Sequence, residues 1–369
     1  MQDMKIFNTM IKNNIEYNVM SKNKIVAKYS NNKLKIIDSK LAPFYLIRTN
    51  DFKSWIENRA IDAHRPSSRI LKKLLRIKDY SDFNTALHNH AVTLTDCYWV
   101  KTTEENLDWS NVKLNSDYLA NLIMEGNCDV NLIKDSKTYE TTNTGSYEKC
   151  WKLIDDKWYM IKLGTKEQIF SETLTSRLCN LLGFKTARYL KYNDKSIISE
   201  LFIDNEKYCL EEMNSLVDED IDFKTNIEIL NKLEKIYDAN LVKDYLDILT
   251  MDVIVYNVDR HTRNYGIIRD CETGNVISMA PNYDNNLTLL SNMQKLGLVT
   301  PKIFIDDLKE VITKDYLNSL PSISYNQIKN IVEKTGKECN ISEDVYGKLT
   351  LFIKANYESI KGININEEE

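Results

Sequence analysis

The chain has 369 residues, of which 43% are hydrophobic and 28% are charged, and its formal net charge is −5. This length is more than one compact core usually supports, so we expect two domains or one domain with two lobes. The composition excludes a largely disordered chain. The acidic balance excludes a general attraction to the phosphate backbone of nucleic acids, although it is compatible with a local basic surface.

The apolar stretches and the cysteine spacing bear on the cell compartment and on the state of the thiols. No stretch approaches the roughly 20 apolar residues that cross a bilayer, and the first residues lack the apolar run of a secretory signal, so we expect a cytoplasmic protein. The seven cysteines are widely scattered, with no C-x-x-C pair and no neighbouring histidine pattern. This spacing predicts reduced thiols and argues against a zinc site.

Residues 1–130 are expected to form a small mixed α/β region. Alternating runs at 24–29 and 33–37, separated by Asn-rich turns, indicate an antiparallel sheet. Apolar residues at helical spacing then predict helices at 52–60, 68–77, 82–88 and 117–124. The segment between Lys53 and Lys78 contains eight basic residues and two acidic ones. A solvated helical face explains this basic segment, and a nucleic-acid surface is the alternative.

Residues 131–202 are expected to be richer in strands. Runs at 150–154 and 157–162 surround the acidic pair Asp155-Asp156 and predict a hairpin. A helix is predicted at 167–182, where an apolar stripe ends before Gly183. Two further strands are predicted at 186–192 and 196–202.

Residues 203–369 are expected to be mostly helical, with apolar residues three and four apart at 226–239, 242–256, 325–334 and 343–357. Strands followed by helices indicate an α+β fold with two lobes. The predicted domains are therefore an N-terminal region at 1–130, a sheet-rich lobe at 131–202 and a helical lobe at 203–369.

Polar residues are concentrated in Asn257-Val258-Asp259-Arg260-His261-Thr262-Arg263-Asn264-Tyr265-Gly266 and in Met279-Ala280-Pro281-Asn282-Tyr283-Asp284. In this pattern Asp259 is suited to accept a proton from a substrate hydroxyl, and Asn264 is suited to bind a metal ion. A hairpin is predicted between Gly266 and Ser278, and it would bring Asp284 beside Asn264. The carboxylate oxygen of Asp284 and the amide oxygen of Asn264 are both suited to bind magnesium. The alternative is that Asp259 and Asn264 only cap a helix or turn.

His261 lies inside this pattern, and the chain has only four histidines. Catalysis or metal binding is one interpretation. We favour a structural role, in which His261 hydrogen-bonds the backbone and holds the shape of a catalytic loop.

The segments Asn257-x-Asp259-Arg260-His261-x-x-Asn264-Tyr265-Gly266 and Ala280-Pro281-x-Tyr283-Asp284 resemble the signature of the HipA-like serine/threonine kinases, a family that includes bacterial toxins. The resemblance is specific over residues 256–285 and looser from about residue 140, whereas the N-terminal region is atypical. It implies a bilobal protein-kinase-like fold that binds ATP and Mg²⁺ between a small sheet-rich lobe and a helical lobe.

The resemblance also implies roles for residues in the preceding segment. Lys162, at the end of a predicted strand, becomes the phosphate-binding lysine, and Glu172 on the next helix orients it. An exposed lysine at a strand end is the alternative for Lys162. Glu200 and Phe202 resemble hinge residues that contact adenine, although Phe202 also suits simple core packing.

Residues 143–149 occupy the place of the family's phosphate-covering loop. Gly145, Ser146 and Lys149 are then expected to contact ATP, and Thr144 or Ser146 is a candidate autophosphorylation site. With one glycine the loop departs from a fuller glycine-rich pattern, so fewer backbone N–H groups can approach phosphate freely. An ordinary turn is the alternative.

Taken together, these residues predict ATP- and Mg²⁺-dependent transfer of a phosphoryl group to a Ser or Thr hydroxyl of a protein. The family adds the expectation of a cognate antitoxin or other regulator as a partner. Two alternatives stay open: a kinase-like binding module without turnover, which contacts nucleic acid or a partner through the basic segment, and a small-molecule kinase that uses the same residues.

Overall fold

The structure is a computed structural model and describes residues 15–61, 81–117, 148–219, 221–291 and 302–364. The chain divides into two compact units. Unit 1 comprises residues 1–156, 203–211 and 269–275, and unit 2 comprises residues 157–202, 212–268 and 276–369. Each unit gathers segments that are distant in the sequence, whereas the domains predicted from sequence are continuous stretches.

Unit 1 contains a four-stranded antiparallel sheet of order β3-β2-β1-β4. Its strands are β1 (Tyr17–Ser21), β2 (Lys24–Ser30), β3 (Lys33–Ile36) and β4 (Tyr98–Thr102). Asn31 and Asn32 connect β2 to β3 with φ of 52° and 57°. Asparagine tolerates this left-handed conformation, and two such residues in succession form the tight turn that suits a twisted hairpin. The antiparallel sheet expected here is confirmed.

Short helices accompany this sheet: α2 (Phe44–Thr49), α3 (Phe52–Glu57), α5 (Asp82–Leu87) and α6 (Trp109–Val112). Unit 1 also contains β5 (Lys149–Ile154) and most of β9 (Tyr208–Glu212). Phe52, Trp55 and Ile56 of α3 are buried in one hydrophobic cluster with Val19 and Val26 of the sheet. The helix predicted at 68–77 and nearly all of that at 117–124 lie outside the described residues.

The basic segment at 53–78 lies mostly outside the described residues, but one member is clearly not a surface charge. Arg59 is buried and donates to both carboxylate oxygens of Asp96 at 2.8 Å. The expectation of a uniformly solvated basic face is therefore wrong at Arg59, because a buried guanidinium needs a paired carboxylate.

Unit 2 begins with an antiparallel sheet in which β6 (Lys157–Leu163) pairs with β8 (Ser196–Glu200), and β8 pairs with β7 (Tyr189–Asn193). Asp155 and Asp156 precede β6 as a turn in which both residues have positive φ. In the register of β6, Lys162 lies opposite Ile197 of β8.

Helix α9 (Lys166–Leu182) follows β6 and matches the helix predicted at 167–182. The Thr165 side chain accepts a hydrogen bond from Gln168 N, and the Gln168 side chain accepts one from Thr165 N, so the first turn is capped reciprocally. Gly183 ends the helix with φ of 75°, a conformation that favours glycine. This helix places Glu172 at a fixed position in the interior of unit 2.

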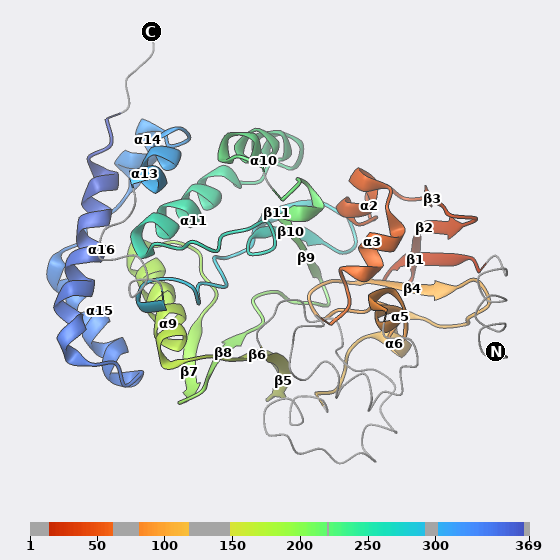
Figure 1. Cartoon of the computed structure of the whole chain (residues 1–369). Coiled ribbons are helices and arrows are strands. Elements are labelled where there is room, and N and C mark those ends of the chain that lie inside the picture. Colours follow the sequence, from red (N-terminus) through yellow and green to blue (C-terminus); the bar gives the residue numbers. More distant parts are fainter. Residues whose placement is uncertain (1–14, 62–80, 118–147, 220, 292–301, 365–369) are drawn as a thin grey trace, which may run out of the picture. The chain divides into compact units, whose positions relative to one another are not determined.

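The rest of unit 2 is largely helical and contains α10 (Phe223–Tyr237), α11 (Val242–Val255), α13 (Lys302–Lys309), α14 (Lys314–Ser319), α15 (Tyr325–Glu338) and α16 (Tyr346–Lys361), with short η1 (Met213–Ser215) and η2 (Glu343–Val345). Helices α15 and α16 lie side by side (Figure 1). The hairpin of β10 (Gly266–Asp270) and β11 (Val276–Met279) was expected. Within the described part of the chain, every helix is too short or too polar to span a bilayer.

Candidate active site

The polar loop predicted from sequence begins where α11 ends. Tyr256 takes up the left-handed conformation with φ of 55°, which stops the helix and starts the loop that runs to β10. Asn257 turns back onto the helix, because its Nδ2 donates to Asp252 Oδ1 at 2.9 Å and its Oδ1 accepts from Asp259 N at 3.1 Å. The loop therefore starts from a fixed position.

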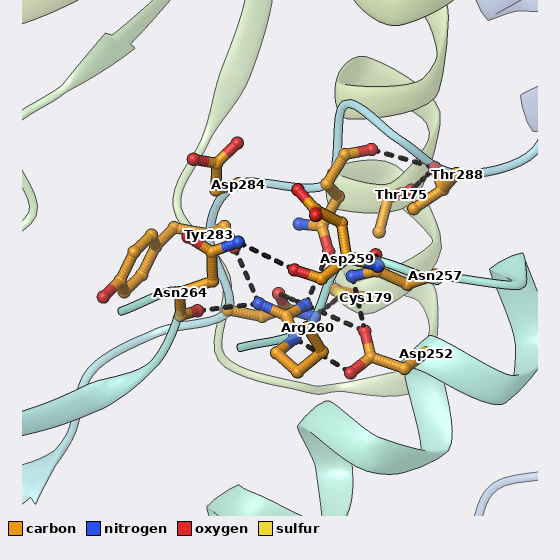
Figure 2. Close-up of polar contacts among 12 residues, drawn as sticks. Thr175, Cys179, Asp252, Asn257, Asp259, Arg260, Asn264, Tyr283, Asp284 and Thr288 are labelled. Atoms are coloured by element: carbon orange, nitrogen blue, oxygen red, sulfur yellow. Dashed lines mark hydrogen bonds and ion pairs between the residues drawn. The ribbon is translucent and has the colours of Figure 1, made fainter. Parts of the chain in front are cut away.

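Arg260 holds this loop together (Figure 2). Its guanidinium forms a bidentate pair with Asp252 of α11, with Nε–Oδ2 and Nη2–Oδ1 distances of 2.8 Å. Its Nη1 also donates to the carbonyls of Asn264 at 2.7 Å and of Tyr283 at 3.0 Å. Arg260 is thus the side chain that joins α11, the loop and the segment after β11.

Two amides complete the set of Arg260 acceptors, since Nη2 donates to Asn282 Oδ1 at 3.0 Å and to Asn285 Oδ1 at 2.9 Å. Burial lowers the pKa of the Arg260 guanidinium, but the Asp252 carboxylate outweighs burial and the pKa lies above its ordinary value. Arg260 is therefore a permanent charge with a structural task.

The three loop residues singled out from sequence lie close together. Asn264 Nδ2 donates to the carbonyl of Asp259 at 3.0 Å, and Asn264 N donates to the carbonyl of His261 at 2.8 Å. His261 is exposed, and its Nδ1 lies 3.2 Å from Arg263 N. These contacts fit a role for His261 in the shape of the loop.

The second polar segment follows β11. Asp284 has φ of 58°, a left-handed conformation that aspartate adopts at local cost, and its N–H donates to the hydroxyl of Tyr189 at 3.2 Å. The Tyr283 hydroxyl donates to the carbonyl of Arg263 at 3.1 Å. Residues before and after β10 and β11 are thus joined, as the predicted hairpin requires.

Lys162 lies between two carboxylates. Its Nζ donates to Glu172 Oε1 at 3.1 Å and forms a very short contact with Asp284 Oδ1. The other Glu172 oxygen accepts from Asn285 N at 2.8 Å. The sequence alternative of an exposed lysine is wrong, because Lys162 is only 6% exposed. Three segments, β6, α9 and the stretch after β11, therefore meet at one ammonium group.

The Lys162 ammonium and the carboxylates beside it shift one another's pKa values. Burial lowers the pKa of Lys162, but the Asp284 and Glu172 carboxylates outweigh burial and hold it above its ordinary value. Burial raises the pKa of Glu172, and Lys162 opposes that rise. Burial also raises the pKa of Asp259, assisted by Asp284 and opposed by His261. The ammonium stays charged, and Asp259 is a stronger base than an ordinary aspartate.

The other residues expected to contact ATP are those of the hinge and of the phosphate-covering loop. Glu200 ends β8 and accepts from Lys157 Nζ at 2.8 Å, and the Phe202 ring stacks on the Tyr283 ring with centroids 5.7 Å apart. Lys149 begins β5 in unit 1. Thr144, Gly145 and Ser146 lie outside the described residues.

Sequence reasoning quoted Arg260 only as part of the motif and gave it no role, and it did not single out Asp252 or Asn285. A signal existed for Asp252, since an acidic residue within the apolar helix stretch 245–255 is buried and needs a partner. No comparable signal existed for Asn285, because its contact depends on the tertiary fold.

Comparison with known proteins places these residues in a family. The sequence profile of the HipA-like C-terminal domain matches residues 141–340, which is more than half of the chain. No match was found among curated proteins.

Two solved structures resemble the fold. HipA of Shewanella oneidensis MR-1, solved as a complex with HipB and operator DNA, is 11% identical with a TM-score of 0.51; the likeness covers 95% of this chain and 100% of HipA. The Helicobacter pylori proinflammatory kinase CtkA is 19% identical with a TM-score of 0.46, over 58% of this chain and 91% of CtkA. Because the profile spans more than half of its residues, the chain belongs to the family of proteins with a HipA-like C-terminal domain, and its fold is protein-kinase-like.

Proposed function

We propose that the protein transfers the γ-phosphoryl group of ATP, with Mg²⁺, to a Ser or Thr hydroxyl of a protein. The observation that carries this proposal is the buried Lys162 ammonium between Glu172 and Asp284, in the same compact unit as Asp259 and Asn264. A lysine that is fixed on a strand and oriented by a helix glutamate is one of the parts from which kinases are built.

The oxygen donors suit magnesium. Mg²⁺ favours carboxylate and amide oxygens together with phosphates. Asp284 supplies a carboxylate, and Asn264 supplies an amide oxygen because its Nδ2 is used by the Asp259 carbonyl. When bound, Mg²⁺ would neutralise charge on the phosphates of ATP.

Lys162 is assigned to the ATP phosphates. Its charge is secure at neutral pH, because both carboxylates hold its pKa high. In this assignment Glu172 keeps the ammonium in place, and its own position is fixed by the N–H of Asn285. The ammonium is then already oriented before the nucleotide binds, so binding does not have to order a flexible side chain.

Asp259 is assigned as the group that accepts the proton of the substrate hydroxyl. Burial raises the pKa of Asp259, which makes its carboxylate a better base than that of an ordinary aspartate. The contacts of Asn257 and Asn264 with the backbone of Asp259 hold its main chain, so the carboxylate is presented from a rigid loop.

The protein acceptor and a regulatory partner rest on the family. Shewanella HipA was solved with HipB and operator DNA. We propose by analogy that a protein regulator controls this chain.

The direct test uses γ-labelled ATP, Mg²⁺ and a lysate of the host cell. We expect label in protein, as phosphoserine or phosphothreonine, and a fall in rate of roughly 100-fold to 10,000-fold for Asp259→Asn, the range of a general base. The ATP concentration for half-maximal rate should change little, because Asp259 is assigned to the acceptor and not to the nucleotide.

Asp238→Asn is the matched control. Asp238 is exposed and is the C-cap of α10, with φ of 52°, a conformation that asparagine adopts readily. The Asp238→Asn variant should therefore be as active as the unmodified protein. If label appears only in a small molecule, the acceptor is that small molecule and not a protein. Equal rates for Asp259→Asn and Asp238→Asn would overturn the assignment of Asp259 as the base.

A further inference from the structure

Three buried thiols meet in unit 1, whereas the residues assigned above to phosphoryl transfer belong to unit 2. The Sγ atoms of Cys97, Cys209 and Cys271 all lie within 4.8 Å of one another, with 3.0 Å between Cys97 and Cys209 and 2.9 Å between Cys209 and Cys271. Their exposed fractions are 0%, 1% and 4%. A single buried cysteine behaves as a small hydrophobic residue, but three in mutual contact form a potential ligand set.

Each thiol comes from a different segment of unit 1. Cys97 belongs to residues 1–156, Cys209 to 203–211 and Cys271 to 269–275, which are the three segments that make up the unit. No C-x-x-C pair marks these cysteines in the sequence, because they are separated by 112 and 62 residues and converge only in the tertiary fold.

Backbone hydrogen bonds fix the positions of these segments. Lys22 N donates to the carbonyl of Cys97 at 2.9 Å, and Leu210 N donates to the carbonyl of Thr95 at 2.8 Å. Cys271 N donates to the carbonyl of Lys207 at 2.8 Å. The thiols are therefore held together by the main chain and not by side-chain packing alone.

We propose that Cys97, Cys209 and Cys271 bind one Zn²⁺ ion as thiolates, with the Ser21 hydroxyl as a fourth, oxygen donor. Ser21 is buried, and its Oγ lies 3.3 Å from Cys97 Sγ. With Zn–S bonds of about 2.3 Å, tetrahedral geometry separates sulfurs by about 3.8 Å. The Cys97–Cys209 and Cys209–Cys271 sulfur pairs thus need to move apart by less than about 1 Å, and the three thiol protons pass to solvent.

Charge selects zinc over a monovalent soft ion. Three thiolates with Zn²⁺ carry a net charge of −1, whereas with Cu⁺ they carry −2. The ammonium of Lys22, paired with Glu272 at 3.0 Å, interacts electrostatically with Cys271 and Cys97.

The arrangement favours a metal over a disulfide. A disulfide would use two of the three sulfurs and leave the third as a buried thiol, and burial of 96% or more limits access by an oxidant. A zinc ion uses all three and joins the three segments of unit 1. Its role is then structural, since four protein ligands leave no open position for catalysis.

The test is metal analysis of the full-length chain, stripped with a chelator under reducing conditions and exposed to a small excess of Zn²⁺. We expect about one tightly held zinc per chain, and Cys97→Ser, Cys209→Ser and Cys271→Ser should each lose it. Cys150→Ser and Cys339→Ser are the controls, because these thiols are equally buried and lie outside the cluster, and both should keep the zinc.

The unmodified protein gives a second readout if the serine variants fail to fold. Alkylation with and without the chelator, mapped by mass spectrometry, should show chelator-dependent labelling at Cys97, Cys209 and Cys271. Cobalt in place of zinc should show absorption from thiolate-to-metal charge transfer. A chain that retains no zinc, protection that maps to other cysteines, or a Cys209 disulfide in freshly purified protein would each overturn the proposal.

Discussion

Lys162 illustrates how one residue can be costly for folding and useful for function. Taking an ammonium out of water is unfavourable unless carboxylates accompany it, and here Glu172 and Asp284 do so. The fully buried Glu172 has the converse requirement, because burial favours its neutral form. Replacement of a buried ion set by apolar residues of similar volume is often neutral or stabilising, so stability alone does not account for this set, and its presence agrees with the nucleotide site proposed above.

Lys162→Met should make stability depend on pH. Burial already raises the folded-state pKa of Glu172, and loss of Lys162 removes the charge that opposes that rise. A carboxyl whose folded pKa exceeds its unfolded pKa favours the fold at low pH and loses that contribution as pH increases. We expect the variant to lose about 3 kcal/mol at neutral pH and to recover part of it near pH 5.

Denaturant unfolding at the two pH values checks this prediction. Lys157→Met is the control, because Lys157 pairs with Glu200 on the surface at 2.8 Å and such pairs contribute little. A Lys162→Met variant whose stability relative to the unmodified protein is the same at both pH values would contradict the assignment of Glu172 as the buried counter-charge.

At the scale of elements, Arg260 couples one helix to two polar segments. Asp252 of α11 receives its bidentate pair, and the carbonyls of Asn264 and Tyr283 accept from one nitrogen. The planar five-donor guanidinium makes this geometry attainable, whereas a lysine has one nitrogen. The loop and the Asp284 segment therefore keep their places through Arg260.

Arg260→Lys should destabilise the protein by roughly 3 kcal/mol and reduce phosphoryl transfer, because Asp252 is buried and loses its bidentate partner. Arg263→Lys is the control: its side chain is 34% exposed and lies 3.3 Å from Glu219, so a change below about 0.5 kcal/mol is expected. Thermal unfolding and transfer rates measure both effects, and equal behaviour of the two variants would count against the role of Arg260.

Two glycines in neighbouring helices should respond oppositely to alanine. A Cβ at Gly336 of α15 overlaps the ring of Tyr346, whose hydroxyl donates to the Ile341 carbonyl at 2.9 Å. A Cβ at Gly347 of α16 meets nothing within 4 Å. Gly336→Ala should cost about 2 kcal/mol from overpacking, and Gly347→Ala should gain about 0.5 kcal/mol from helix propensity. Denaturant midpoints test both, and stabilisation by Gly336→Ala would contradict the packing of α15 on α16.

Local patterns were enough to predict most elements. The period-two runs of β2 and β3, the capped helix α9 and the apolar stripes of α11 and α15 are visible in sequence, since each depends on neighbouring residues. The predicted start of α16 at residue 343 was early, because residues 343–345 form the separate turn η2. Long-range features could not be predicted, namely the Arg260 contacts and the convergence of three cysteines.

At the scale of the whole molecule, the two compact units hold different chemistry. Lys162, Glu172, Asp259, Asn264 and Asp284 all belong to unit 2, whereas the three-thiol cluster belongs to unit 1. The family profile begins at residue 141 and covers all of the described candidates for phosphoryl transfer. Loss of zinc is therefore expected to affect the stability of unit 1 and not the transfer step itself.

The most direct test of the central claim is an experimental structure of the chain with Mg²⁺ and a non-hydrolysable ATP analogue. We predict that Lys162 Nζ contacts the phosphates and that oxygens of Asn264 and Asp284 bind the same magnesium ion. Asp259 should lie on the side of the terminal phosphate from which a hydroxyl approaches. A nucleotide bound elsewhere, or a magnesium ion that neither Asn264 nor Asp284 contacts, would contradict the proposed phosphoryl-transfer site.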